Sequence, residues 1–128
     1  MIGTDNQQRR ILLIDDDIFM IRLLTLFLEK SAYRIITAGN GKDGMRILEE
    51  QPIDLIVLDL MMPEMDGLVF LRWLRQEAKA TLPTLVLTSM TENGIEQQVL
   101  ATGATAILYK PIKPAALVAK IEQLLHDA

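Results

Sequence analysis

Two kinds of segment alternate along this chain when its hydrophobic and polar positions are compared. Short apolar runs, each too brief for a helix, predict strands at 11–14, 33–38, 55–58, 84–88 and 106–109. Longer segments with apolar residues every three or four positions predict helices at 18–30, 42–50, 67–78, 92–101 and 114–125. Strand and helix therefore alternate five times.

The character of the strands indicates the fold class. The runs at 11–14, 55–58 and 84–88 are apolar throughout, which is typical of a parallel sheet covered by helices on both faces. Right-handed crossovers between such strands give a doubly wound α/β fold. We therefore expect a five-stranded parallel sheet with five helices, in the flavodoxin-like class.

Length and composition fit one small domain. The chain has 128 residues, of which 50% are hydrophobic, and we expect a flexible arm at 1–9, one domain at 10–126 and a short end at 127–128. The formal charge of −4 gives no reason to expect nucleic-acid or membrane binding. Zero cysteines exclude disulfides and thiolate metal sites, and a cytoplasmic protein is the default expectation.

Polar side chains follow several of the predicted strands at the points where they end. Asp15 and Asp16 follow the first strand, Asp59 follows the third, and Thr88 and Lys110 close the fourth and fifth. Carboxyl ends of parallel strands share one edge of the sheet, where α/β folds bind their ligands. Taken singly, Asp59 could cap a loop and the acidic triplet could be a solvated helix start, but the combination favours a site.

Carboxylates gathered at such an edge repel one another unless a cation lies among them. Their ligands are oxygen atoms, with no histidine or cysteine close by in the sequence, and this favours a hard ion. We expect Mg²⁺, with Mn²⁺ as the alternative.

The motifs together resemble those of a known family. They are Ile14-Asp15-Asp16, Leu58-Asp59 with Met62-Pro63, Asp66-Gly67, Leu87-Thr88-Ser89, and Tyr109-Lys110-Pro111. In this order and spacing they resemble the receiver domain of two-component response regulators, over nearly the whole chain. The resemblance implies the strand order 2-1-3-4-5.

The resemblance also implies a role for each residue of the set. Asp59 resembles the aspartate that takes a phosphoryl group from phosphohistidine on a histidine kinase or phosphotransfer protein. Asp15, Asp16, Asp59 and the backbone carbonyl of Met61 would hold the metal. Thr88 and Lys110 resemble the hydroxyl and ammonium that contact the phosphoryl group, and a cis Lys110–Pro111 bond is frequent in the family.

Further implications concern partners. Phosphorylation would switch the surface of the fourth helix, fifth strand and fifth helix, which would control an effector domain or protein. The resemblance also allows a homodimer. The helix at 18–30 is apolar beyond a single stripe, and we interpret the surplus as a docking surface slightly ahead of simple overpacking.

Two departures from the family pattern change the expectations. Ile107 occupies the usual aromatic position three residues before Lys110, so coupling to the outer face is expected to be weaker. Met61 and Met90 lie two residues beyond Asp59 and Thr88, and thioethers cannot position an attacking water. The sequence therefore predicts a long-lived acyl phosphate.

Other functions of the same fold class remain as alternatives. An aspartate-nucleophile phosphatase commonly has a second aspartate where Met61 stands. A flavin or nucleotide site needs a glycine-rich loop after the first strand, which here is acidic. A degenerate receiver acting as a scaffold would not need the acidic set. Phe70 is expected in the core, Trp73 at its rim, and His126 and the remaining charged residues in structural or solvated positions.

Overall fold

The computed structural model describes residues 8–62 and 66–127, so positions 1–7 of the predicted arm, 63–65 and 128 lie outside the described part. The strands are β1 (Arg10–Ile14), β2 (Arg34–Ala38), β3 (Leu55–Asp59), β4 (Thr84–Thr88) and β5 (Ala106–Tyr109). The helices are α1 (Ile18–Lys30), α2 (Gly41–Glu50), α3 (Gly67–Arg72), the π-helical turn η1 (Trp73–Glu77), α4 (Ile95–Thr102) and α5 (Pro114–Asp127). The order along the chain is the predicted one.

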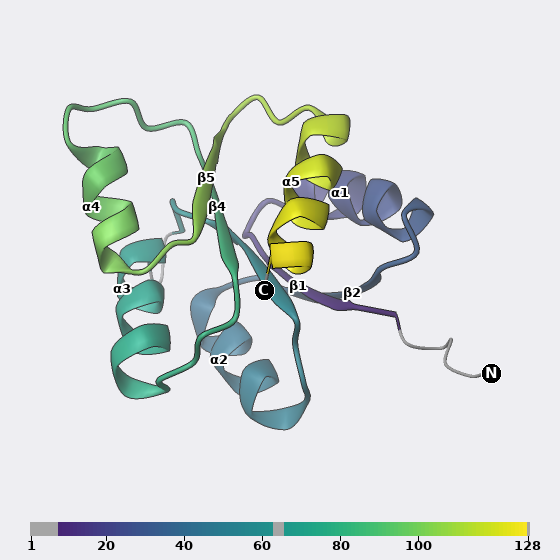
Figure 1. Ribbon diagram of the computed structural model, residues 1–128, viewed down its shortest axis with the longest axis horizontal. Helices are drawn as coiled ribbons and strands as arrows, with labels where there is room; N and C mark the ends of the chain where they lie inside the picture. Colours follow the sequence, from purple (N-terminus) through teal and green to yellow (C-terminus); the bar gives the residue numbers. More distant parts are fainter. Residues whose placement is uncertain (1–7, 63–65, 128) are drawn as a thin grey trace.

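The five strands form one parallel sheet in the order β2-β1-β3-β4-β5, which confirms the predicted fold class. Helices α1 and α5 lie on one side of this sheet, and α2, α3 and α4 lie on the other (Figure 1). Strands β1 and β3 are direct neighbours in the sheet, although β2 lies between them in the sequence. Their register, in which Ile14 is opposite Leu58, brings the two strand ends level.

Two hydrophobic clusters hold the layers together, and the strands supply both by their alternation. Leu12 and Ile14 of β1 join the cluster under α2, α3 and α4, whereas Ile11 and Leu13 join the cluster under α1 and α5. All four side chains are fully buried. Because both faces of the sheet are covered, the sequence of β1 is apolar at every position rather than at every second one.

The third predicted helix is not uniform. It divides into the short α-helix α3 and the π-helical turn η1, in which the Ala78 N–H donates to the carbonyl of Trp73, five residues earlier. The helix predicted over 67–78 is therefore present, but its second half is π-helical, which apolar spacing over so few residues does not distinguish from an α-helical turn. Phe70 is buried in the core and Trp73 is half-buried beside it, as predicted.

The fourth helix also begins later than predicted, at Ile95 rather than near residue 92. Gly94 has φ +86° at the position before the helix, a left-handed conformation that suits glycine. The first helix, in contrast, begins as expected, with the Asp17 carboxylate accepting hydrogen bonds from the N–H groups of Phe19 and Met20.

Arg75 is an exception to the prediction that the remaining charged residues are solvated. Its Nε donates to the carbonyl of Gly103 at 2.9 Å, and Nη1 donates to the carbonyls of Ala80 at 3.0 Å and Leu82 at 2.9 Å. Its Nη2 donates to Thr84 Oγ1 at 3.2 Å. All these acceptors are neutral, and burial lowers the pKa of the Arg75 guanidinium. One side chain thus ties η1 to the start of β4 and to the end of α4.

The surplus apolar residues of α1 lie on the surface. Phe19 is 78% exposed, Leu26 60% and Ile18 58%, so this helix is not merely overpacked in the core. Among the described residues, none of the helices combines the length and apolarity that a membrane span requires.

Replacing Arg75 with methionine should lower the free energy of unfolding by about 2–4 kcal/mol, because several partly buried carbonyl groups lose their donor together. Chemical denaturation followed by circular dichroism measures this. Arg72→Met is the matched control: Arg72 is exposed and lies one turn earlier, and its replacement should change stability by less than about 0.5 kcal/mol. Equal losses in the two variants would contradict the role of Arg75.

Candidate functional site

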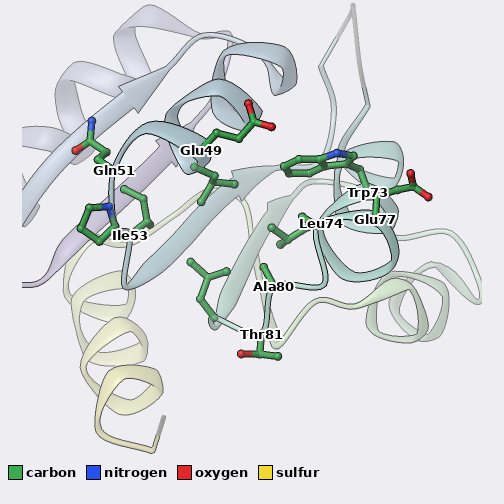
Figure 2. A pocket seen from close by; sticks show the side chains of 12 residues that line it. Glu49, Gln51, Ile53, Trp73, Leu74, Glu77, Ala80 and Thr81 are labelled. Carbon is green, nitrogen blue, oxygen red and sulfur yellow. The ribbon is translucent and has the colours of Figure 1, made fainter.

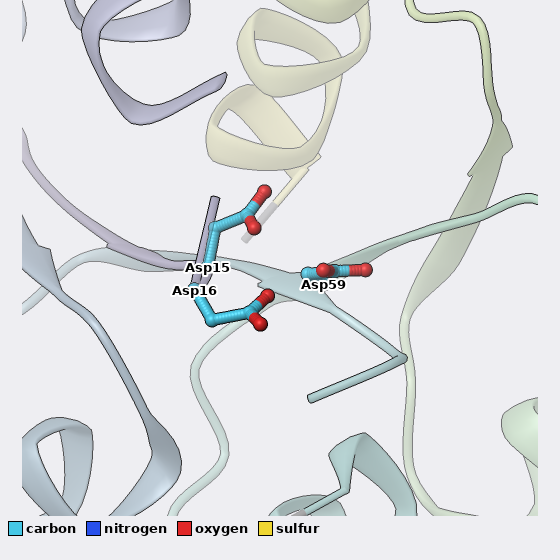
Figure 3. A group of neighbouring side chains, drawn as sticks. All are labelled: Asp15, Asp16 and Asp59. Atoms are coloured by element: carbon cyan, nitrogen blue, oxygen red, sulfur yellow. The ribbon is translucent and has the colours of Figure 1, made fainter. Parts of the chain in front are cut away.

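Three aspartates converge where β1 and β3 end. Asp59 is the last residue of β3, and Asp15 and Asp16 follow directly after β1 (Figure 3). One carboxylate oxygen from each lies within 4.8 Å of the others. Because the two strands are parallel neighbours, their carboxyl ends bring the side chains to one place, as the sequence predicted.

Asp59 is nearly inaccessible, with 4% of its surface exposed, and its charge is compensated from two directions. Oδ1 accepts a hydrogen bond from Lys110 Nζ at 3.2 Å, which is also an ion pair. The same oxygen accepts from the backbone N–H of Met61 at 3.3 Å. The Lys110–Pro111 peptide bond is cis, as the family resemblance implied.

Asp15 is fully buried and only partly satisfied. Its Oδ1 accepts from the backbone N–H of Asp17 at 2.9 Å, whereas its Oδ2 has no hydrogen-bond partner among the described residues. Burial, followed by the repulsion of Asp59, raises the pKa of the Asp15 carboxyl to about 6. A buried carboxylate oxygen without a partner is costly, and a cation between the three carboxylates would remove that cost.

The residues present fit a hard divalent cation. Asp15 and Asp59 supply buried carboxylate oxygens, and the exposed Asp16 supplies a third from the solvent side. None of the described residues donates a hydrogen bond to the backbone carbonyl of Met61, two residues beyond Asp59. An all-oxygen set that leaves room for water is the kind that Mg²⁺ prefers.

Thr88 lies at the same edge of the sheet without a direct bond to Asp59. It ends β4, one residue beyond Leu87, which is the register partner of Asp59. Its hydroxyl accepts from the N–H of Met90 at 3.0 Å, and its carbonyl accepts from the N–H of Lys110 at 2.8 Å. The structure therefore brings together Asp15, Asp16, Asp59 and Lys110, and it places Thr88 beside them on a neighbouring strand.

A contact that the sequence did not reveal closes the loop after Asp59. The N–H of Gly67 donates to the carbonyl of Leu60 at 2.8 Å. A Cβ at position 67 would lie 2.8 Å from the Leu60 Cα, so no larger residue fits without moving the backbone. The Asp66-Gly67 pair indicated a turn in the sequence, but not this close approach of two backbone segments.

Strand β5 carries Ile107 at the position where the family usually has an aromatic residue. Ile107 packs against the core cluster under α4, and Tyr109, two residues later, is 42% exposed. The register pairs Tyr109 with Thr88, and the Tyr109 hydroxyl donates to Glu96 Oε1 on α4 at 3.3 Å. Ile107 and Tyr109 share a face of the sheet, as the strand period predicts.

Residues 11–122 match the family described as the response regulator receiver domain. The chain belongs to this family. The three aspartates, Thr88 and Lys110 all lie inside the matched range. The predicted resemblance is thereby confirmed.

Curated relatives of this receiver domain are regulators. Response regulator GtcR of Aneurinibacillus migulanus is 36% identical over 120 residues, which cover 94% of this chain and 49% of GtcR. The alkaline phosphatase synthesis transcriptional regulatory protein PhoP of Bacillus subtilis is 36% identical over 118 residues, covering 92% and 49%. The receiver domain thus spans about half the length of the curated relatives it matches.

Solved structures give the same result for the fold. Chemotaxis response regulator CheY4 of Vibrio cholerae has a TM-score of 0.85 and 28% identity, covering 92% of this chain and 99% of CheY4. A CheY-like receiver domain protein from Methanospirillum hungatei has a TM-score of 0.88 and 25% identity, covering 94% and 96%.

In the metal-free receiver domain, Asp15→Asn should raise the unfolding free energy at pH 7 by about 2–3 kcal/mol. The native state binds more protons than the unfolded chain between the ordinary pKa of 3.8 and the raised pKa of about 6. Asp15 therefore makes the unfolding free energy fall as pH rises through this window. Asparagine does not titrate, so the variant is free of this loss, and its side-chain oxygen still accepts from Asp17 N–H.

Urea unfolding from pH 3.5 to pH 7.5 in chelator measures the effect as a difference between the two proteins, because all other carboxylates contribute equally to both. The difference should be small at the acid end and grow toward pH 7. A constant difference across the range would contradict a raised pKa at Asp15.

Proposed function

We propose that this receiver domain accepts a phosphoryl group on Asp59, in a Mg²⁺-dependent reaction, from a histidine kinase or histidine phosphotransfer protein. The phosphorylated domain then controls a downstream effector domain or protein through the face formed by α4, β5 and α5. The observation that carries this proposal is the meeting of Asp15, Asp16 and Asp59 within 4.8 Å, with Lys110 Nζ on Asp59.

The transfer requires a nucleophile and a way to manage charge. A carboxylate oxygen of Asp59 attacks phosphorus, the bond from phosphorus to the donor imidazole nitrogen breaks, and the imidazole leaves to take up a proton. The product is an acyl phosphate. Mg²⁺, or Mn²⁺, would be held by Asp15, Asp16, Asp59 and the Met61 carbonyl, and it supplies charge neutralisation and alignment of the phosphoryl oxygens.

Lys110 and Thr88 are placed to respond to the new group. The ammonium of Lys110 lies 3.2 Å from Asp59 and is able to pair with a phosphoryl oxygen once Asp59 is phosphorylated. The Thr88 hydroxyl uses its oxygen to accept from Met90 N–H, so its proton is available for donation. A phosphoryl group adds up to two negative charges, which attract the Lys110 ammonium and the Thr88 hydroxyl toward its oxygen atoms.

The route to the output face runs through the loop after β4. A turn of the Thr88 hydroxyl toward the phosphoryl group releases Met90 N–H at the start of the segment that leads to α4. Ile107 contributes a packed aliphatic side chain where the family usually has an aromatic one, and we infer weaker coupling to the outer face for this reason.

The alternatives are less well supported by the same geometry. A phosphatase of this fold needs an acid or base beside the nucleophile, but the Met61 side chain is a thioether that points to solvent at 56% exposure. A scaffold that never takes up phosphate gains nothing from a buried, destabilised Asp15 beside Asp59. The phosphoacceptor function accounts for both features.

Incubation with Mg²⁺ and a small acyl-phosphate donor should add one phosphoryl group to the protein, seen by intact mass spectrometry. Asp59→Asn should abolish the adduct, and Asp15→Asn or Asp16→Asn should raise the Mg²⁺ concentration needed for it. Asp43→Asn, a surface aspartate paired with Arg46, is the control and should react as wild type.

A steady release of phosphate without a lasting adduct would identify an enzyme instead. A wild-type protein that takes up no phosphate although Mg²⁺ raises its melting temperature would support the scaffold function.

The acyl phosphate should be long-lived, because neither Met61 nor Met90 can orient an attacking water. Introducing a carboxylate with Met90→Glu should shorten its half-life several-fold, measured by loss of the adduct after removal of the donor. Leu100→Glu, on the exposed surface of α4, provides the control. A half-life unchanged by Met90→Glu would contradict this explanation.

A further inference from the structure

A cavity of about 650 Å³ lies at the edge of the sheet opposite Asp59. It is formed by the end of α2, the connection from α2 to β3, the turn η1 and the connection from η1 to β4 (Figure 2). These segments precede β3 and β4, whereas the aspartates follow β1 and end β3. The volume is within the range of about 300–1000 Å³ that small-molecule pockets occupy.

Part of the wall of this cavity is apolar and packs against the core, beside polar lining residues such as Gln51 and Thr81. Leu74 is fully buried, and Leu48, Ile53, Ala80 and Leu82 are partly buried against the same core cluster. The N–H of Ala80 donates to the Leu74 carbonyl at 2.9 Å, which closes the turn at the end of η1. Arg75 holds the carbonyls of Ala80 and Leu82 from behind. These contacts hold the apolar part of the wall in place, so the cavity offers apolar surface to the hydrocarbon part of a ligand.

The rim has a different character. Trp73, Glu49 and Glu77 line it, and these two glutamates are the charged lining residues, with no lysine or arginine among the residues that form the cavity. The Trp73 ring is oriented by its contact with Phe70, at a centroid distance of 5.7 Å. Within the described part of the chain, neither glutamate forms an ion pair.

An indole face and carboxylates around an apolar cavity are complementary to one chemical class. The indole attracts a cation through its π-electrons, the carboxylates attract it by charge, and the cavity wall favours an apolar body attached to it. A neutral ligand of the same shape loses the first two interactions, and an anion is repelled by the glutamates.

We propose that this cavity is a binding site for an organic cation, in which an ammonium group on an apolar body lies against Trp73 between Glu49 and Glu77. The site goes beyond the phosphoacceptor function and does not depend on it, because it shares no residue with the aspartate cluster. Its ligand class is the alkylamine, a cationic head on a hydrocarbon body.

The chain offers a direct probe, because Trp73 is its single tryptophan. Titration with hexylamine should change the intrinsic fluorescence in a saturable manner and shift the indole N–H resonance of Trp73. Hexan-1-ol should bind about tenfold more weakly, since it lacks the charge. Hexanoate should give no saturable change.

Charge-neutral variants test the rim. Glu49→Gln and Glu77→Gln should each weaken hexylamine binding several-fold, and the double variant should bind it more weakly than either single variant. Glu29→Gln, an exposed residue of α1 on the other face of the sheet, removes the same charge and should bind as wild type. Circular dichroism and a denaturation curve verify that each variant is folded.

Three results would overturn the proposal: no saturable response to hexylamine, equal binding of hexylamine and hexan-1-ol by the wild type, or hexylamine binding by the double variant as tight as by the wild type. Asp59→Asn separates this site from the phosphoacceptor function, because it abolishes the phosphoryl adduct and should leave hexylamine binding unchanged. Loss of hexylamine binding in Asp59→Asn would contradict the independence of the two sites.

Discussion

Repulsion among three carboxylates is the interaction on which the rest of this structure depends. Asp15, Asp16 and Asp59 would separate in a flexible chain, and they stay within 4.8 Å only because two paired strands end beside each other. The cost is visible in the raised pKa of Asp15 and in its unpartnered oxygen. Lys110 and two backbone N–H groups compensate part of it. The burial of the apolar residues of β1 and β3 offsets the rest of this electrostatic cost, so the acidic site depends on the apolar core.

Much of this arrangement could be predicted from the sequence, since both the strands and the site arise from strong local signals. An apolar run such as 55–58 has one stable position in a covered sheet, and the residue that follows it, Asp59, then lies at the edge by necessity. The same rule placed Asp15, Thr88 and Lys110. The family motifs supplied the roles of these residues, which the apolar pattern alone does not contain.

The features that the sequence did not reveal are contacts between segments distant along the chain. Arg75 has the same local pattern as a solvated helical arginine, and its hydrogen bonds to the carbonyls of Gly103 and Leu82 join segments that this pattern does not connect. The close approach of Gly67 to Leu60 is of the same kind. The π-helical turn at Trp73–Glu77 differs from an α-helical one by a single hydrogen-bond step, which amino-acid spacing does not encode.

The contact between Leu60 and Gly67 has a mechanical consequence for the loop that it encloses. Leu60 is itself fastened to β4 through its N–H bond to the Leu87 carbonyl, so the loop between the two residues leaves from and returns to one fixed point. Gly67 is in turn fastened to Leu60, so the start of α3 is joined to the end of β3 and, through it, to β4. The strand that carries Asp59 and the helix that follows it are therefore fixed to each other at one point, and a displacement of α3 is transmitted directly to the strand that holds the nucleophile.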